Sequence, residues 1–244
     1  MFKTLKEAFK TKDVRNKILL TFLILFIYRV GAWLPIPGIN VDAFSGGVEN
    51  DASFLSLLSA LSGGALANGA ILALGVAPYI NASIIIQLLT FVVPSLERLS
   101  KQGDAGRKKI NFYTRIIALV MSIAQAIGIV VAFSGAGLMH VRLWPAAPSF
   151  LTAMIVVLVL VAGGMFTLWL GEKITKIGVG NGLSLLIFVG ILSSAGQAIF
   201  GSVQGIVSGG GTGAWTLVIF LLAVVVIVGL IAFIDLAQRK IPVQ

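Results

Sequence analysis

Long apolar stretches alternate with short charged segments along most of this chain. Stretches of this kind predict membrane-spanning helices, because a hydrocarbon core about 30 Å thick needs about 20 apolar residues. The expected spans are residues 18–34, 78–96, 112–134, 150–170, 183–200 and 215–234. The last two belong to one uncharged stretch, which the turn-rich segment GSVQGIVSGGGTG at 201–213 divides. The pattern therefore predicts six crossings.

The uncharged run between Asp51 and Glu97 is different, because it is too long for one crossing and too interrupted for two. Residues 78–96 form one span, which leaves the glycine-rich half before them. Irregular backbone survives at membrane depth only where protein or a water-filled cavity surrounds it, since lipid cannot pair its amides and carbonyls. We therefore expect residues 54–69 to form a half-helix that enters and stops.

The basic residues test this topology, since Lys and Arg concentrate in short cytoplasmic loops. All but Arg29 and Arg142 lie within residues 1–17, 98–115, 173–176 and 239–240. Six crossings put these four regions on one side of the membrane. A second crossing by the uncharged run would put the loop at 98–115 on the side opposite the N-terminal arm. The charge pattern therefore favours a single crossing and a cytosolic N-terminus.

Composition agrees with this topology, because 58% of residues are hydrophobic and 11% are charged, against about 25% charged in soluble domains. An integral membrane protein is indicated. The chain has no cysteine and a single histidine, His140, so we expect no disulfide and no metal site. The net charge of +9 suits anionic lipid headgroups better than sequence-specific nucleic-acid binding. The segment GDAGRKK at 103–109 is interpreted as a basic turn that docks a cytosolic partner or only sets topology.

Polar residues inside the spans are few. Arg29 lies too deep for a free charge, and we expect it to snorkel or to bond loop carbonyls as a structural anchor. Asn81 and Gln87 either tie two helices together or belong to a mixed stripe for a separable helix contact, with Ile84, Leu88 and Phe91 at helical spacing.

Nothing in the chain predicts catalysis. Its acidic residues all fall in expected loops or at span ends, so no intramembrane carboxylate pair exists for a proton relay or hydrolysis. The phosphate-binding pattern GxxxxGK[ST] is also missing, so ATP chemistry would have to come from a partner. We expect no enzyme activity, no catalytic residue and no cofactor.

Several ordered motifs resemble the SecY family of bacterial protein-conducting channels. They are LPIPGIN at 34–40, LSGGAL at 61–66, GVAPYINASIIIQLLT at 75–90, GRKKINFYTR at 106–115 and WLGEKITKIGVGNGLSLLIF at 169–188. Family members usually have ten spans in two inverted halves, and this sequence resembles the first six, up to the start of a large cytosolic loop. The resemblance implies an all-α integral membrane fold with six transmembrane helices and a re-entrant plug half-helix. Its expected parts are a basic arm at 1–17, five spans with the plug at 18–203, an external loop at 204–214, the sixth span at 215–235 and the loop start at 236–244.

The resemblance also assigns roles to residues. The pore ring would be Val76, Ile80, Leu183 and Ile187, and the lateral gate would include Asn81, Ile84, Gln87, Leu88 and Phe91. The plug would include Phe54, Leu55, Leu57, Leu58, Leu61, Ser62, Gly63, Gly64, Leu66, Asn68 and Gly69. Cytosolic partners would dock at Arg107, Lys108, Lys109, Arg239 and Lys240. Each ring pair is one helical turn apart, and an apolar constriction blocks ions by dewetting. From the sequence alone, however, the interpretation of these four residues as ordinary lipid-facing or core residues is favoured, because apolar residues are the norm in spans.

The function implied by the resemblance is a passive channel in the bacterial cytoplasmic membrane. It would move unfolded polypeptides across the membrane and release apolar segments, such as signal sequences, sideways into lipid. Expected partners are SecE, SecG, the SecA ATPase, the ribosome, membrane lipids and the C-terminal half of the channel. Two alternatives remain at this point. One is half of a secondary small-solute transporter, whose broken helices form midplane sites, and the other is a membrane assembly scaffold.

Overall fold

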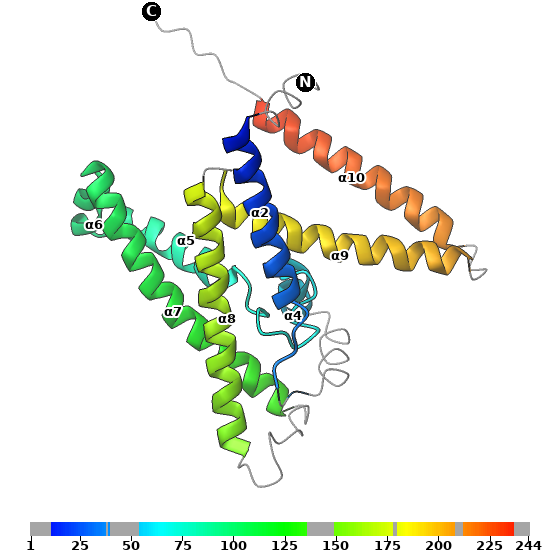
Figure 1. Ribbon diagram of the computed structural model, residues 1–244, viewed down its shortest axis with the longest axis horizontal. Helices are drawn as coiled ribbons and strands as arrows, with labels where there is room; N and C mark the ends of the chain where they lie inside the picture. The colour runs from blue at the N-terminus through cyan, green and yellow to red at the C-terminus, as the bar shows by residue number, and fades with distance from the viewer. Residues whose placement is uncertain are drawn as a thin grey trace, which may run out of the picture. The chain divides into compact units, whose positions relative to one another are not determined.

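The computed structural model describes residues 11–37, 39, 54–135, 149–177, 180–207 and 212–236. The chain divides into two compact units, Met1–Ser193 and Ser194–Gln244. Apart from one isolated bridge between Pro35 and Ala70, the regular structure of these residues is helical. The helices, shown in Figure 1, are α2 (Lys12–Gly31), α4 (Phe54–Leu61), α5 (Ala77–Val92), α6 (Pro94–Ser100), α7 (Gly103–Gly135), α8 (Ser149–Ile177), α9 (Gly182–Val207) and α10 (Thr212–Leu236).

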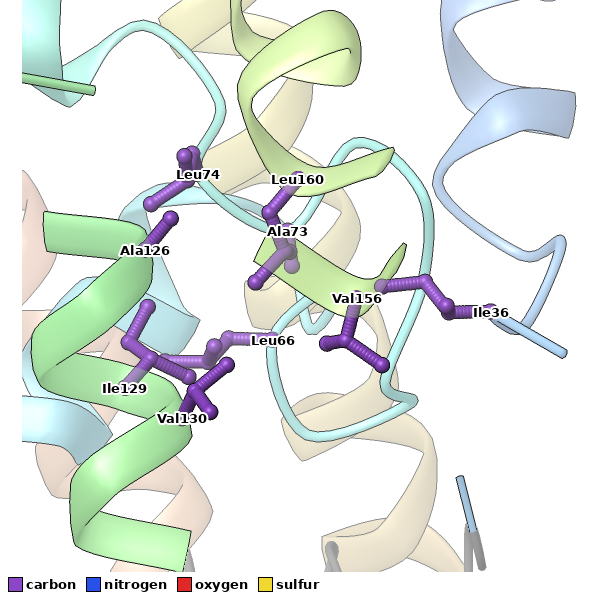
Figure 2. Close-up of a cluster of buried hydrophobic side chains, with 9 residues drawn as sticks. All are labelled: Ile36, Leu66, Ala73, Leu74, Ala126, Ile129, Val130, Val156 and Leu160. Carbon is purple, nitrogen blue, oxygen red and sulfur yellow. The ribbon is translucent and has the colours of Figure 1, made fainter. Parts of the chain in front are cut away.

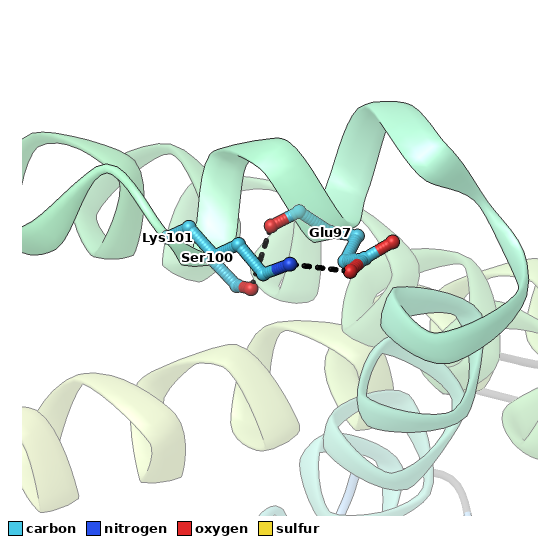
Figure 3. A network of polar contacts seen from close by, with 3 residues as sticks. All are labelled: Glu97, Ser100 and Lys101. Carbon is cyan, nitrogen blue, oxygen red and sulfur yellow. Dashed lines mark hydrogen bonds and ion pairs between the residues drawn. The ribbon is translucent and has the colours of Figure 1, made fainter.

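The expectation of one unbroken spanning helix over residues 78–96 is wrong, although the bent pair that replaces it can still count as one span. Helix α5 ends at Val92, and α6 begins at Pro94 at an angle of 106° to it. Proline has no amide hydrogen and disfavours helical backbone in the residue before it, and Val93 is accordingly extended with φ −100° and ψ 110°. Within α6, Lys101 Nζ lies 2.6 Å from Glu97 Oε1, and Ser100 Oγ donates to Glu97 O at 2.8 Å (Figure 3).

The interpretation of residues 103–109 as a turn is also wrong, because these residues form the first two turns of α7. Gly106 suggested a turn, but its role here is packing. A Cβ atom at Gly106 would collide with the carbonyl oxygen of Leu99, so the glycine lets α7 lie close to α6. Arg107, Lys108 and Lys109 follow it as good helix formers, and all three side chains are exposed.

The core of the first unit surrounds the irregular segment, which we define as residues 62–76. Its Leu66, Ala73 and Leu74 pack with Ile36 and with residues of α7 and α8, as Figure 2 shows: Ala126, Ile129, Val130, Val156 and Leu160. All nine side chains are at least nine-tenths buried. Protein therefore surrounds this irregular backbone. The expected half-helix over residues 54–69 is shorter than predicted, because α4 ends at Leu61 and the positive φ of Gly63, Gly64 and Gly69 makes residues 62–69 turns.

The loop after α2 reinforces that enclosure. Helix α2 ends at Gly31, three residues before the expected end of the first span, and residues 34–36 run beside residues 69–71 of the irregular segment. Ile36 N donates to Gly69 O and Ile71 N to Leu34 O, both at 2.9 Å. These two bonds satisfy backbone groups that neither helix nor lipid would satisfy.

Three helical stretches among the described residues are long and apolar enough to cross a membrane, namely Gly103–Ala132, Phe150–Ile177 and Gly182–Gly201. A fourth is counted if the bent pair of α5 and α6 is one span. Helix α2 carries several charges near its start, and the apolar stretch counted in α10, Val218–Ile234, is shorter than the 18 residues that a candidate span requires. The count of six crossings therefore stays a prediction.

The second unit contains the end of α9 and the whole of α10. Helix α9 extends to Val207, so the expected external loop at 204–214 begins inside a helix. Helix α10 is apolar along its length, and large side chains such as Trp215, Val225 and Phe233 are at least 70% exposed. Exposed apolar surface around a whole helix is typical of a helix in lipid or against another protein.

Candidate functional site

Two serines organise the predicted plug, which comprises α4 and the first part of the irregular segment. Ser62 Oγ donates to Ser59 O at 3.0 Å and accepts from Leu66 N at 3.3 Å. Ser59 Oγ accepts from Ala67 N, also at 3.3 Å. Serine hydroxyls here replace the helical hydrogen bonds that the glycine-rich sequence gives up, so the segment has a defined conformation.

A close contact between two glycines joins this segment to α9. Gly63 has φ +71°, and a Cβ atom there would lie 2.9 Å from Gly190 Cα. A Cβ at Gly190 would lie 2.9 Å from Leu61 O. Backbone therefore meets backbone at this point, and any larger residue would force the two elements apart.

Arg29 holds the same turn from the other side. Its Nη1 donates to Gly63 O at 2.9 Å, and its guanidinium carbon lies 5.9 Å from the centre of the Trp33 ring. The expectation that Arg29 bonds a loop carbonyl as a structural anchor is confirmed. Because the bond joins α2 to the irregular segment across 34 residues of sequence, it fixes the segment against the first helix.

The four predicted ring residues come together in one apolar cluster. Val76 is 6% exposed, and Ile80, Leu183 and Ile187 are half-buried against the cluster that contains it. Val76 and Ile80 come from the start of α5, and the other two come from the start of α9. Their grouping agrees with the predicted ring, and their role as a pore constriction stays a prediction.

The predicted plug lies directly against this ring. A small cavity of about 30 Å³ lies where they meet. It is lined by Leu58, Leu61, Ser62, Leu74, Gly75, Val76, Ala77, Ile80 and Ile187. Its lining is apolar except for Ser62, whose hydroxyl is already bonded within the segment. Plug and ring therefore meet across a narrow, apolar contact.

A much larger cavity of about 540 Å³ adjoins the ring at Leu183, and most of the residues that line it have polar or charged side chains. Arg115 Nη2 lies 2.6 Å from Glu172 Oε2, which joins α7 to α8 at the cavity wall. The remaining lining residues are Tyr79, Asn111, Thr175, Lys176, Gly180 and Asn181. This cavity offers charged and amide groups next to an apolar constriction.

The turn between α8 and α9 is held by side chains that our sequence reasoning missed. Thr175 Oγ1 donates to Gly171 O and accepts from Gly182 N, both at 2.9 Å. Asn181 Oδ1 accepts from Leu183 N at 3.1 Å, which caps the start of α9. Asn before an apolar run is a recognised N-cap signal, so Asn181 could have been found; the pairing of Arg115 with Glu172, 57 residues apart, left no local signal.

The predicted lateral-gate residues lie on the outer face of α5. Ile84, Leu88 and Phe91 are 49%, 61% and 86% exposed, whereas Pro78, Ala82 and Ile86 form the buried face. Asn81 is half-buried, and Gln87 Nε2 donates to Ser83 Oγ of the same helix at 3.4 Å. The mixed stripe thus exists as an exposed surface, and its use as a gate stays a prediction.

Two remaining expectations concern docking and metals. The exposed Arg107, Lys108 and Lys109 lie on the first turns of α7, whereas Arg239 and Lys240 lie outside the described residues. Within the described part of the chain, no three His, Cys, Asp or Glu side chains gather in a way that would hold a metal ion.

Fold and site together define a helical integral membrane protein whose irregular segment is enclosed by helices and rests on an apolar cluster. A family model described as SecY matches residues 70–244. The chain belongs to the SecY family.

Individual relatives agree with this assignment. The chain is 42% identical to the protein translocase subunit SecY of Streptococcus sanguinis, which it matches over 100% of its own length and 56% of the relative. The corresponding SecY of Staphylococcus carnosus is 40% identical, with 100% and 57% covered. A solved structure described as Sec61 in the canine ribosome-channel complex from the endoplasmic reticulum has a TM-score of 0.60 at 19% identity, with 93% of this chain and 49% of that chain covered. The chain spans about half the length of the curated relatives it matches.

Proposed function

We propose that this chain supplies the N-terminal half of a passive protein-conducting channel in the bacterial cytoplasmic membrane. The observation that carries the proposal is that the predicted plug packs against the predicted ring, with only an apolar cavity of about 30 Å³ between them. An apolar constriction of this kind excludes ions by dewetting, while its flexible side chains yield to a passing peptide. Membership of the SecY family supports the same role.

The proposal includes six crossings with a cytosolic N-terminus, and a second half that completes the ring and the gate. The exposed stripe of Ile84, Leu88 and Phe91 on α5 would face that second half and open sideways to lipid for apolar segments. SecE and SecG would complete the complex, and SecA or the ribosome would supply the driving energy. The basic start of α7 would be one docking surface for them.

A small-solute transporter is the main alternative, and Arg29 is the residue that bears on it. Transporters place charges beside broken helices to bind substrate. Arg29 does lie beside the broken segment, but its Nη1 is bonded to Gly63 O and its guanidinium lies beside the Trp33 ring. These contacts favour a structural role for the charge over a substrate site.

Crosslinking in the complete translocation complex tests the proposal. The chain has no cysteine, so Val76→Cys and Leu183→Cys introduce single thiols at the ring, and Phe26→Cys introduces one on the exposed face of α2. A stalled translocating polypeptide with a thiol-reactive probe should crosslink to the two ring positions and not to Phe26→Cys. Crosslinks confined to Phe26→Cys would reject the ring as a pore.

Deletion of residues 54–69 separates a channel from a scaffold. A gated pore that loses its plug should leak ions in planar bilayers, whereas a scaffold should not. Unchanged conductance, with the complex still assembled, would contradict the channel proposal.

A further inference from the structure

Two small cavities share Gly75 and Val76 in their linings, where the irregular segment becomes α5. One is the apolar cavity of about 30 Å³ against the ring. The other has a volume of about 10 Å³ and is lined by Gly75, Val76, Pro78, Tyr79, Ala118, Ser122, Gly164, Met165 and Leu168. A water molecule needs about 10–15 Å³ of such space, so the second cavity has room for a single one.

A buried hydroxyl lines the second cavity. Ser122 on α7 is 1% exposed, and its Oγ has no hydrogen-bond partner among the described residues. The space beside it exists because residue 164 is glycine, since a Cβ atom there would lie 2.9 Å from Ser122 Oγ. Buried hydroxyls are nearly always paired with protein or with ordered water, so this one calls for a partner.

The start of α5 brings further polar groups to the same place. Val76 is the N-cap residue and makes no side-chain cap hydrogen bond, and a proline occupies the first turn. Tyr79 N and Ile80 N are already paired, since both donate to Val76 O at 3.1 Å, whereas Val76 N takes part in no backbone hydrogen bond among the described residues. The first amides of a helix have no partner within the helix, and buried waters typically bond two to four such groups.

We infer that this cavity binds one structural water molecule, held by Ser122 Oγ and by Val76 N at the start of α5. The ring-side cavity, although larger, stays dry. Its one hydroxyl, that of Ser62, already donates to Ser59 O and accepts from Leu66 N. Val76 thus separates a dry contact with the predicted plug from a hydrated contact with α7 and α8.

High-resolution electron cryomicroscopy of the full-length chain in its complex, in lipid nanodiscs, tests this inference directly. We expect a density peak about 2.7–3.0 Å from Ser122 Oγ that disappears in Ser122→Ala, and none in the ring-side cavity. Two results would overturn the inference. One is the lack of that peak in a map that shows other buried waters, and the other is Ser122 Oγ bonded to Ala118 O of its own helix.

Thermal unfolding gives an independent readout with a matched control. Thr152 Oγ1 on α8 is also buried without a partner among the described residues, but Thr152 lines neither cavity. If Ser122 holds a water, Ser122→Ala should lower the melting temperature by on the order of 2 °C. Thr152→Val should leave it unchanged or raise it, because an unpaired hydroxyl is removed. Equal responses of the two variants would count against a bound water at Ser122.

Discussion

Two of the cavities that adjoin the ring differ in size and in lining. The cavity toward the predicted plug measures about 30 Å³ and lies beside a contact between backbone atoms of Gly63 and Gly190. The cavity at Leu183 measures about 540 Å³ and is lined by polar side chains, including the ion pair of Arg115 and Glu172. Backbone atoms close the contact beside the smaller cavity, whereas side chains border the larger one.

This difference indicates where a barrier to passage lies. Side chains such as Arg115 and Lys176 move by changing rotamer, on the nanosecond scale. A backbone contact such as Gly63 with Gly190 opens only when a whole segment moves. We therefore expect substitutions at the plug contact to change gating strongly and substitutions at the polar cavity to change it little.

The largest expected effect comes from Gly190→Val. A side chain there would collide with Leu61 O and push the predicted plug away from α9. Overpacking of this kind costs about 1–3 kcal/mol, and each 1.4 kcal/mol is a tenfold change in an equilibrium, so the resting ion conductance should rise roughly tenfold to a hundredfold. Planar-bilayer recordings of the complete complex measure it.

Gly128→Val on α7 is the matched control for that variant. It makes the same chemical change in a helix, but a Cβ at Gly128 meets no atom within 4 Å. Its conductance should equal that of the unaltered protein. If Gly128→Val leaks as strongly as Gly190→Val, the leak does not arise from the contact between the two glycines.

Arg29→Gln should have the next largest effect. It removes the charged donor to Gly63 O, and hydrogen bonds of charged groups contribute about 1.5–3 kcal/mol. Because Arg29 is only half-buried, we expect the lower end of that range, which is an increase in leak of about tenfold. Arg29→Lys keeps a charged donor and should leak less than Arg29→Gln. Equal conductance of Arg29→Gln and the unaltered protein would show that Arg29 does not stabilise the closed state.

At the polar cavity, breaking the ion pair should affect stability slightly and gating hardly at all. The side chains of Arg115 and Glu172 are 45% and 23% exposed, and such pairs contribute about 0.2–1 kcal/mol. A double-mutant cycle of Arg115→Gln and Glu172→Gln in thermal unfolding should give a coupling in this range that weakens with salt. If Arg115→Gln or Glu172→Gln leaks as much as Gly190→Val, the plug contact and the polar cavity do not differ in their control of gating.

Much of the fold was predictable because hydrophobic length and charge are local signals. The apolar stretches of α7, α8 and α9 and the enclosed irregular segment all follow from them. The bend at Pro94 was missed because we weighted the apolar character of residues 78–96 above the local effect of proline. The segment 103–109 was misread because glycine marks both turns and close helix packing, and only the position of Leu99 shows that Gly106 serves packing.

The site was predictable to a smaller degree. Spacing alone could not separate Val76 and Ile80 from ordinary apolar residues, and the resemblance to SecY proteins was needed to select them. The deep position of Arg29 did predict a bond to a loop carbonyl, since a charge at that depth needs a partner. The contact of Gly63 with Gly190 and the unpaired hydroxyl of Ser122 depend on how distant segments pack, which a single sequence does not reveal.

The ion pair on α6 provides the smallest effect and a reference for the pair in the polar cavity (Figure 3). The hydrogen bond and charge of Lys101 hold the pKa of Glu97 below its ordinary value. Lys101→Met should raise the pKa of Glu97 toward its ordinary value, measurable by NMR of carbon-13-labelled glutamate. Because the folded pKa is the lower one, any stabilisation is present above the ordinary pKa and is lost as pH falls through the folded pKa. Both side chains are exposed, so the melting temperature at pH 7 should not change. If Lys101→Met lowers the melting temperature as much as Glu172→Gln does, the difference in exposure does not explain how much each ion pair contributes to stability.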